Sequence, residues 1–223
     1  MKSILILGAS RGLGRALTEA YLAQGQRVIA TVRKSEDMAP LQALGAQVLQ
    51  VDLADPASVS GLAWQLDGKS INLALYVAGV WDGHAAGVPP TQQQFDKVMH
   101  SNVLGFMQAL PQIAPMVQET GGVIAAFSSE MSLLGSADES AWLYRVSKAA
   151  LNMAVASACQ QWPGLTLLAL DPGWTQTDMG GPGATVPLAD SVKGLMNVLT
   201  QVQPEDRGSL WRYDGTKTEL LGA

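Results

Sequence analysis

The chain alternates short apolar runs with segments of helical length, and this alternation restricts its fold more than any other feature. The candidate strands are residues 3–7, 27–32, 47–51, 73–77, 122–127, 165–170 and 208–213. Most are continuously apolar, which is typical of strands covered on both faces. Strands separated by helices usually pair in parallel and form a doubly wound sheet. The sequence therefore predicts an α/β fold of the Rossmann type, with a parallel sheet of about seven strands between two helical layers.

The segments between the strands carry signals for helix formation. The predicted helices are residues 12–24, 35–45, 56–66, 92–119, 142–162 and 188–202. Asp55 and Pro56 form a helix start, since aspartate caps free N–H groups and proline suits the first helical position. Thr91 can cap the long segment that follows it. Pro111 and Pro115 lie inside that segment and are expected to kink it.

Length and composition favour one soluble domain. A chain of 223 residues suits a single α/β domain, so residues 1–223 are expected to form one unit. Apolar residues make up 48% of the chain and charged residues 15%, which provides for a large core. The net charge of −5 argues against a nucleic-acid-binding face. The lone Cys159 allows no internal disulfide and no apolar run is long enough to cross a membrane, so a cytoplasmic protein is predicted.

The first apolar run leads directly into a glycine-rich turn, ILILGASRGLG. Gly8, Gly12 and Gly14 have the spacing GxxxGxG between a predicted strand and a predicted helix. Glycines here allow a tight turn, close approach of the backbone to a pyrophosphate, and packing of the helix on the strand. The turn therefore predicts a dinucleotide-phosphate site, with a purely structural turn as the alternative. The other residues of this predicted site are Ser10, Arg11 and Leu13.

The ends of the second and third strands bear on the choice of nucleotide. Asp52 follows the third strand and could bond an adenine amino group while Leu53 lines the ring; a turn aspartate is the alternative. The second strand ends in Thr31-Val32-Arg33-Lys34 and lacks the acidic residue that NAD sites usually have there. Arg33 and Arg11 would suit the extra phosphate of NADP, because guanidinium groups pair phosphate in a bidentate way. NADP(H) is therefore predicted in preference to NAD(H), with solvated surface arginines as the alternative.

Tyr144 and Lys148 stand four residues apart in AWLYRVSKAALNMA, so a helix would place them on one face. A unit charge about 5 Å away, at an effective dielectric near 20, is worth about 3 kcal/mol or roughly two pKa units. The pKa of the phenol is expected to fall from about 10 toward 8, helped by the positive end of the helix dipole. Such a group can protonate a carbonyl oxygen or deprotonate an alcohol. The alternative is an amphipathic tyrosine beside a surface lysine.

Ser129 and Asn102 complete the candidate catalytic residues. Ser129 follows the fifth strand in IAAFSSE, where a hydroxyl faces the ligand crevice of such sheets and could orient a substrate oxygen. Ser128 competes for this role, and both serines could merely satisfy backbone groups at the strand end. Asn102 lies within a predicted helix, where asparagine is a poor former. Its amide is expected to hold a water or a backbone group and to connect Lys148 to solvent; the alternative is a buried polar residue with satisfied hydrogen bonds.

Several bulky side chains are predicted to border the crevice. They would favour an apolar or aromatic carbonyl compound, although core or lid packing explains them equally well. These residues are Trp81, Met131, Trp142, Trp174 and Met179. His84 could border the substrate, but a solvated loop histidine is the plainer interpretation. Neither His84 nor His100 belongs to a cluster of cysteines or carboxylates at metal-ligand spacing, so no metal site is predicted.

The order and spacing of these motifs resemble the short-chain dehydrogenase/reductase family over essentially the whole chain. The resemblance rests on residues 8–14, Val77-Ala78-Gly79, Asn102, Ser129, Tyr144 with Lys148, and Asp171-Pro172-Gly173. The stretches PGWTQTDMGG and GSLWRYDG look like those of the C-factor and sniffer-type carbonyl reductase branch. Val77 and Leu7 depart from the asparagine and threonine that the family often has at these positions. The departures suggest an altered support of the site without loss of catalysis.

The resemblance implies a catalytic tetrad, in which Tyr144 is the acid and base and Asn102 supports the proton relay. Ser129 would position the carbonyl, and Lys148 would also bond the nicotinamide ribose. The cofactor would also be contacted by Ala78, Gly79, Pro172, Gly173, Thr175 and Thr177, of which the two threonines would hold the nicotinamide carboxamide.

The implied activity is NADP(H)-dependent reduction of an aldehyde, ketone or quinone to an alcohol, or the reverse, on a single dinucleotide-binding and catalytic domain. Relatives imply a homodimer or homotetramer that associates through residues 92–119 and 142–162. The expected partner is a small-molecule substrate, not a nucleic acid or a membrane. A different reading is a non-catalytic or weakly catalytic NADP(H)-binding signalling or interaction protein, because a fold does not fix a function.

Overall fold

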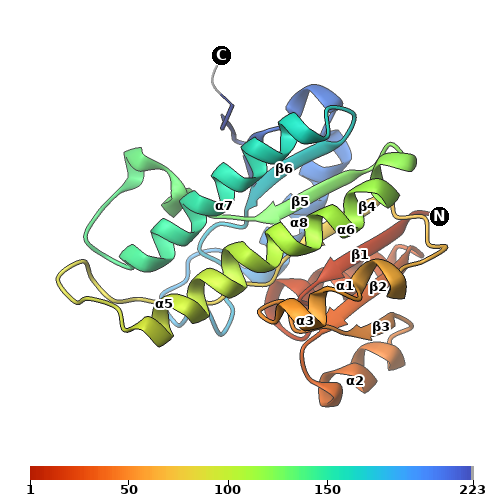
Figure 1. The fold of residues 1–223 in the computed structure, drawn as a ribbon, viewed down its shortest axis with the longest axis horizontal. Helices are drawn as coiled ribbons and strands as arrows, with labels where there is room; N and C mark the ends of the chain where they lie inside the picture. The colour runs from red at the N-terminus through yellow and green to blue at the C-terminus, as the bar shows by residue number, and fades with distance from the viewer. Residues whose placement is uncertain (222–223) are drawn as a thin grey trace.

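The computed structural model describes residues 1–221 and consists of one sheet with helices on both faces (Figure 1). The strands are β1 (Ser3–Leu7), β2 (Arg27–Val32), β3 (Gln47–Gln50), β4 (Leu73–Tyr76), β5 (Val123–Phe127), β6 (Thr166–Asp171), β7 (Ser209–Arg212) and β8 (Lys217–Glu219). Their order across the sheet is β3-β2-β1-β4-β5-β6-β7-β8. Every neighbouring pair is parallel except β7 and β8, which are antiparallel. The order confirms the predicted doubly wound Rossmann-type fold.

The helices form two layers that cover the two faces of the sheet. They are α1 (Gly12–Ala23), α2 (Met38–Ala43), α3 (Pro56–Val59), α4 (Leu62–Gln65), α5 (Gln92–Met99), α6 (Gly105–Glu119), α7 (Trp142–Gln161) and α8 (Leu188–Gln201). One apolar core joins the sheet to α3, α4, α6 and α7, and a second joins its other face to α1, α2 and α8 (Figure 1). The three-layer α/β/α arrangement therefore follows from two separate cores.

The continuous apolar strands have a direct explanation in these two cores. Successive side chains of a strand point to opposite faces of the sheet. In β1, Leu5 and Leu7 belong to the core under α6 and α7, whereas Ile4 and Ile6 belong to the core under α1 and α8. A strand covered on both faces therefore needs apolar residues at every position.

The long helix predicted over 92–119 is interrupted, and the interruption is not at the prolines. α5 and α6 are separated by a wide π-helical turn at His100–Leu104, which contains Asn102. Pro111 and Pro115 lie on the exposed side of α6, which runs through both of them. The break comes where the Asn102 side chain bonds the backbone of Val80 rather than where an N–H group is missing. The segment 56–66 likewise divides, into α3 and α4.

The strand β8 was not predicted, because its sequence Lys-Thr-Glu is short and polar. It pairs with β7 and forms the edge of the sheet, and its Lys217 ammonium lies 2.8 Å from carboxylate oxygens of Asp206 and of Glu219. Charged side chains are common on edge strands, where they discourage pairing with other chains. No helix in residues 1–221 combines the length and apolar character needed to cross a bilayer.

Candidate active site

The candidate residues gather at the carboxyl ends of four neighbouring strands. Gly8 follows β1, Gly79 comes shortly after β4, Ser129 follows β5, and Asp171 ends β6. The helix α7 packs against this edge, and its Lys148 donates a hydrogen bond of 2.6 Å to the carbonyl oxygen of Phe127, the last residue of β5. Ligands bind at this edge in doubly wound sheets, so the predicted nucleotide and catalytic residues share one region.

The glycine turn after β1 is packed so tightly that side chains are excluded. Gly8 has φ 94°, in the left-handed region that favours glycine. A Cβ atom on Gly14 would lie 2.1 Å from the Gly8 carbonyl oxygen, and one on Gly8 would lie 2.8 Å from the Ala78 backbone nitrogen. Arg11 precedes α1 and makes no side-chain cap, so the first N–H groups of this helix are left for another acceptor. These features fit a pyrophosphate at the helix N-terminus.

A hollow of about 560 Å³ lies between the segments that follow β2 and β3 and the helix α5. Its lining brings Arg33 together with Ala54, which follows the predicted adenine contacts Asp52 and Leu53. One Asp52 oxygen accepts a hydrogen bond of 3.0 Å from the Ala54 N–H, so this aspartate also acts as a turn residue. The lining residues that the sequence had not suggested are Val80, Gln92, Gln93, Asp96, Lys97, His100 and Ser101.

Val80 lies in the loop after β4, and the other additional residues lie along α5 and the π-helical turn after it. The sequence signal that could have pointed to them is that they all follow β4, whose carboxyl end borders the site. Lys97 adds a second cation to the hollow that Arg33 lines. Arg11 does not line this hollow; its Nη1 lies 3.9 Å from a carboxylate oxygen of Asp178, and both side chains are exposed. Of the two arginines considered for the extra phosphate, Arg33 is the one that lines the hollow.

Tyr144 is the third residue of α7 and is only 8% exposed. Burial raises the pKa of Tyr144 above its ordinary value, and the nearby carboxylate of Asp171 raises it further. Burial also lowers the pKa of Lys148 to about 8. The predicted fall in the pKa of Tyr144 is therefore wrong, because the protein's own groups raise this pKa. The Lys148 ammonium lies 5.5 Å from the centre of the Tyr144 ring, and its attraction does not outweigh the loss of water on burial.

Asn102 joins the loop after β4 to α7. Its Oδ1 accepts a hydrogen bond of 2.7 Å from the Val80 N–H, and its Nδ2 donates to the Val80 carbonyl oxygen at 3.0 Å. The same Nδ2 donates at 2.9 Å to Ser147 Oγ. A Cβ on Gly79 would lie 3.3 Å from Asn102 Oδ1 and 3.5 Å from Lys148 Nζ. The amide therefore holds the backbone of Val80, close to the amine of Lys148. Holding a backbone group was one of the roles predicted for it.

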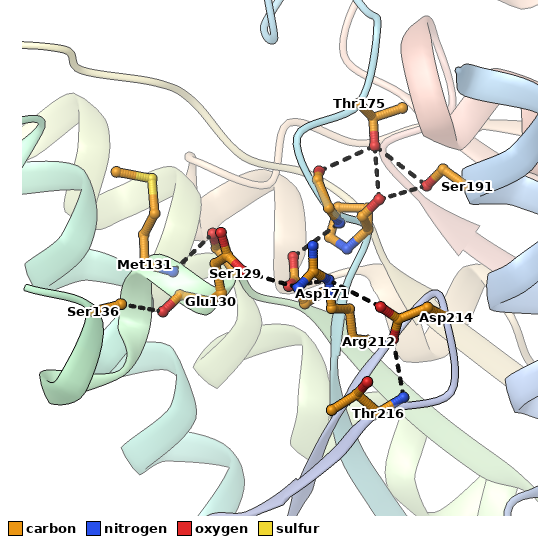
Figure 2. A network of polar contacts seen from close by, with 12 residues as sticks. Ser129, Glu130, Met131, Ser136, Asp171, Thr175, Ser191, Arg212, Asp214 and Thr216 are labelled. Atoms are coloured by element: carbon orange, nitrogen blue, oxygen red, sulfur yellow. Dashed lines mark hydrogen bonds and ion pairs between the residues drawn. The ribbon is translucent and has the colours of Figure 1, made fainter. Parts of the chain in front are cut away.

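The two serines after β5 have different surroundings. Ser129 is half-buried, and its Oγ accepts a hydrogen bond of 3.1 Å from the Met131 N–H (Figure 2). Ser128 is buried, and its Oγ has no hydrogen-bond partner within residues 1–221. Ser129 is therefore the more accessible residue of the pair.

The loop after β6 is held by its own hydroxyl groups. Thr175 Oγ1 and Ser191 Oγ each donate a hydrogen bond of 2.8 Å to the Pro172 carbonyl oxygen (Figure 2). Thr177 Oγ1 accepts from the Gly180 N–H at 3.2 Å, and its methyl group faces the glycine turn near Gly12. The Thr175 hydroxyl is therefore occupied inside the loop, and its backbone is the part left to meet a ligand.

A charged cluster that sequence reasoning missed surrounds Arg212, the last residue of β7 (Figure 2). The guanidinium lies 3.2 Å from Glu130, 3.5 Å from Asp214 and 3.8 Å from Asp171, measured to carboxylate oxygens. Asp171 is buried and also accepts a hydrogen bond of 2.9 Å from the Gly173 N–H. Asp171 had been noted only as part of a motif, because its link to Arg212 depends on the pairing of β6 with β7.

The bulky residues expected around the crevice differ in their surroundings: one contacts Tyr144, and others are exposed or half-buried. The Trp81 and Tyr144 ring centres lie 4.7 Å apart with an angle of 57° between the planes. Trp174 and Met179 are exposed on the loop after β6, whereas Met131 and Trp142 are half-buried. Within residues 1–221, no three His, Cys, Asp or Glu side chains are grouped so as to hold a metal ion.

Comparison with known proteins agrees with this geometry. C-signal of Myxococcus xanthus is 41% identical over 121 residues, covering 52% of this chain and 72% of that protein. A Burkholderia multivorans protein described as a short-chain dehydrogenase/reductase with bound NADP is 29% identical, with a TM-score of 0.88 over 98% of this chain and 99% of its own. Carbonyl reductase Sniffer of D. melanogaster is 25% identical, with a TM-score of 0.90 over the same shares of the two chains.

These relatives confirm the predicted likeness to C-factor and sniffer-type proteins. The family model for short chain dehydrogenases matches residues 2–185, which include the glycine turn, the tyrosine and lysine of α7, and the loop after β6. The chain belongs to the short-chain dehydrogenase family of oxidoreductases.

Proposed function

We propose that this protein is an NADP(H)-dependent carbonyl reductase, or the corresponding alcohol dehydrogenase, with Tyr144 as its general acid and base. The observation that carries the proposal is the placement of Tyr144 and Lys148. Both are buried on the first turns of α7, and the Lys148 amine is bonded to the end of β5. A phenol and an amine buried together beside a nucleotide-shaped turn suit proton transfer to a substrate oxygen.

The cofactor fits residues that this chain provides. Gly8, Gly14 and the uncapped start of α1 would hold the pyrophosphate. Arg33 would meet the extra phosphate of NADP from the hollow that it lines with Lys97. The Burkholderia relative described with bound NADP supports the same choice. When bound, the nicotinamide supplies the hydride for reduction or accepts it in the reverse direction.

The remaining steps belong to the protein. Because burial raises its pKa, Tyr144 keeps its proton at neutral pH and can donate it to the carbonyl oxygen as the alcohol forms. Ser129 would orient that oxygen, while Lys148 would bond the nicotinamide ribose beside it. Asn102 fixes the loop after β4 against α7 and would support the return of a proton from solvent to Tyr144. Thr175 and Thr177 would hold the carboxamide end of the cofactor.

A second copy of the chain is the proposed protein partner. The outward faces of α5, α6 and α7 expose Phe95, Met107, Val146 and Met153. Exposed apolar groups on neighbouring helices suit a homodimer, or a homotetramer built from it. Residues 1–223 are proposed to act as one dinucleotide-binding and catalytic domain within each copy.

Oxidation of NADPH by the purified chain, followed with a panel of aldehydes, ketones and quinones, tests the proposal. We expect turnover with at least one class of carbonyl compound and a lower Michaelis constant for NADPH than for NADH. Turnover that persists undiminished in Tyr144→Phe would contradict the assignment of the acid.

The second candidate is a weakly catalytic NADP(H)-binding signalling protein on the same fold. It is favoured by the name of the Myxococcus relative, C-signal, which is 41% identical over the matched segment. Tight NADPH binding with silence across the whole carbonyl panel would select this second candidate.

A further inference from the structure

Trp81 covers the catalytic tyrosine of the proposed reaction. The tilted rings of Trp81 and Tyr144 lie 4.7 Å apart, centre to centre, which is a favourable aromatic contact. Trp81 is 45% exposed, whereas Tyr144 is only 8% exposed. One part of the indole therefore shields the phenol from water, and the remainder stays open to solvent next to it.

The loop that carries Trp81 is fixed in place by polar contacts. The Asp82 carboxylate accepts a hydrogen bond of 3.2 Å from the His84 N–H and lies 3.0 Å from the His84 ring nitrogen Nδ1. The His84 carbonyl oxygen accepts from the N–H of Trp142, the first residue of α7, at 3.2 Å. These bonds join the loop to the start of the helix that holds Tyr144. The indole is consequently held over the phenol by the backbone and not by its ring contact alone.

We propose that Trp81 determines substrate specificity by forming one wall of the carbonyl site. The wall selects flat aromatic and extended apolar carbonyl compounds over small aliphatic ones. This inference rests on the proposed function, since it requires a carbonyl oxygen to reach Tyr144. A substrate in that position lies beside the open part of the indole. An aryl group gains a ring contact there that a short alkyl chain cannot make.

Shielding of Tyr144 gives the same residue a second measurable effect. Burial is the main reason that the pKa of Tyr144 is raised. Removing the indole lets water reach the phenol, so its pKa falls and the proton needed for reduction is lost at a lower pH. A residue that merely stabilised the fold would not move this limb of the pH profile.

The experiment compares the kinetics of Trp81→Ala and Trp81→Phe with those of the wild-type chain. NADPH-dependent reduction is followed for benzaldehyde and naphthaldehyde against propanal and butanal. In Trp81→Ala we expect kcat/KM for the aryl aldehydes to fall about tenfold, chiefly through KM, and that for the alkyl aldehydes to change less than about twofold. Trp81→Phe keeps an aromatic wall and is expected to keep most of the selectivity.

Trp64→Ala is the matched control, because Trp64 is a tryptophan 83% exposed on α4. It is expected to leave selectivity and the pH profile unchanged. An equal loss of kcat/KM for both aldehyde series, or unchanged selectivity in an active Trp81→Ala enzyme, would overturn the role of Trp81 and leave the proposed function standing. If the wild-type chain shows no turnover with any carbonyl compound, the proposed function is wrong, and the role of Trp81 with it.

Discussion

Lys148 is hydrogen-bonded through its amine to the carbonyl oxygen of Phe127, at 2.6 Å. The bond joins the second turn of α7 to the end of β5. This one bond compensates for only part of the hydration that the ammonium loses on burial, so the pKa of Lys148 is lowered to about 8. The site therefore holds a cation at neutral pH at a cost to stability, which is typical of functional residues.

Lys148→Met is expected to stabilise the protein at neutral pH while it abolishes turnover. The folded pKa of about 8 lies below the ordinary 10.5, so between these values the unfolded chain binds more protons than the folded one. Wild-type stability therefore rises with pH across this window, relative to the variant. After allowing for the lost hydrogen bond, we expect the free energy of unfolding of Lys148→Met to exceed that of the wild type by about 2 kcal/mol at pH 7. This difference should shrink to nearly nothing by about pH 10.

Urea unfolding of both proteins at neutral and at alkaline pH measures this difference. Met153→Leu is a suitable control, because Met153 is exposed on the same helix. A stability difference that stays constant with pH would show that the Lys148 charge is not the cause.

Tyr144→Phe is expected to reduce turnover by at least about a hundredfold, because the substrate oxygen loses its proton donor. NADPH affinity, measured by fluorescence titration, should stay within about twofold, since a single hydroxyl is removed. Tyr21→Phe, at a buried tyrosine of α1 away from the site, should leave both quantities unchanged. Loss of NADPH binding in Tyr144→Phe would mean that the hydroxyl supports the cofactor and not the chemistry.

Asp171→Asn is expected to shift the pH dependence of carbonyl reduction. The Asp171 carboxylate raises the pKa of Tyr144, and the amide keeps an oxygen to accept the Gly173 N–H bond. Without the charge, the Tyr144 pKa falls, so the decline of kcat on the alkaline side should begin at a lower pH. Asp214→Asn removes another carboxylate beside Arg212 and serves as the control. Equal shifts in the two variants would point to Arg212 and not to Asp171.

Gly14→Ala is expected to destabilise the chain by about 2 to 4 kcal/mol and to abolish NADPH binding. Its Cβ would lie 2.1 Å from the Gly8 carbonyl oxygen, so α1 must move away from β1. Gly87→Ala is the control, since no atom lies within 4 Å of the added carbon. Thermal unfolding with and without NADPH measures both effects. A Gly14→Ala protein that NADPH still stabilises would rule out a phosphate cradle at this turn.

Arg33→Asp is expected to reverse the cofactor preference, because it replaces a phosphate partner by a carboxylate that suits ribose hydroxyls. The ratio of Michaelis constants for NADPH and NADH should change by about a hundredfold. Arg27→Asp, at the exposed beginning of the strand that Arg33 follows, should leave the ratio unaltered. If Arg33→Asp behaved like this control, Arg33 would be an ordinary surface residue.

Much of the fold could be predicted from local pattern, whereas features set by distant contacts could not. The strands of the central sheet are continuous apolar runs because both faces are covered, and that property is visible in sequence. The turn at Asn102 was missed because it depends on bonds to Val80, which lies 22 residues away. The raised pKa of Tyr144 was missed because spacing reveals the nearby lysine but not the depth of burial.

The wide turn at His100–Leu104 has a consequence for how this chain can change in length. A π-helical turn holds one more residue than an α-helical turn, so α5 and α6 are out of phase by about 100°. Deleting one residue there would rotate α5 about its axis by that angle, so that charged Lys97 would take the buried position of Val98, and Val98 the half-buried position of Met99. Insertions and deletions in descendants of this sequence should therefore spare this turn and accumulate in the surface loops.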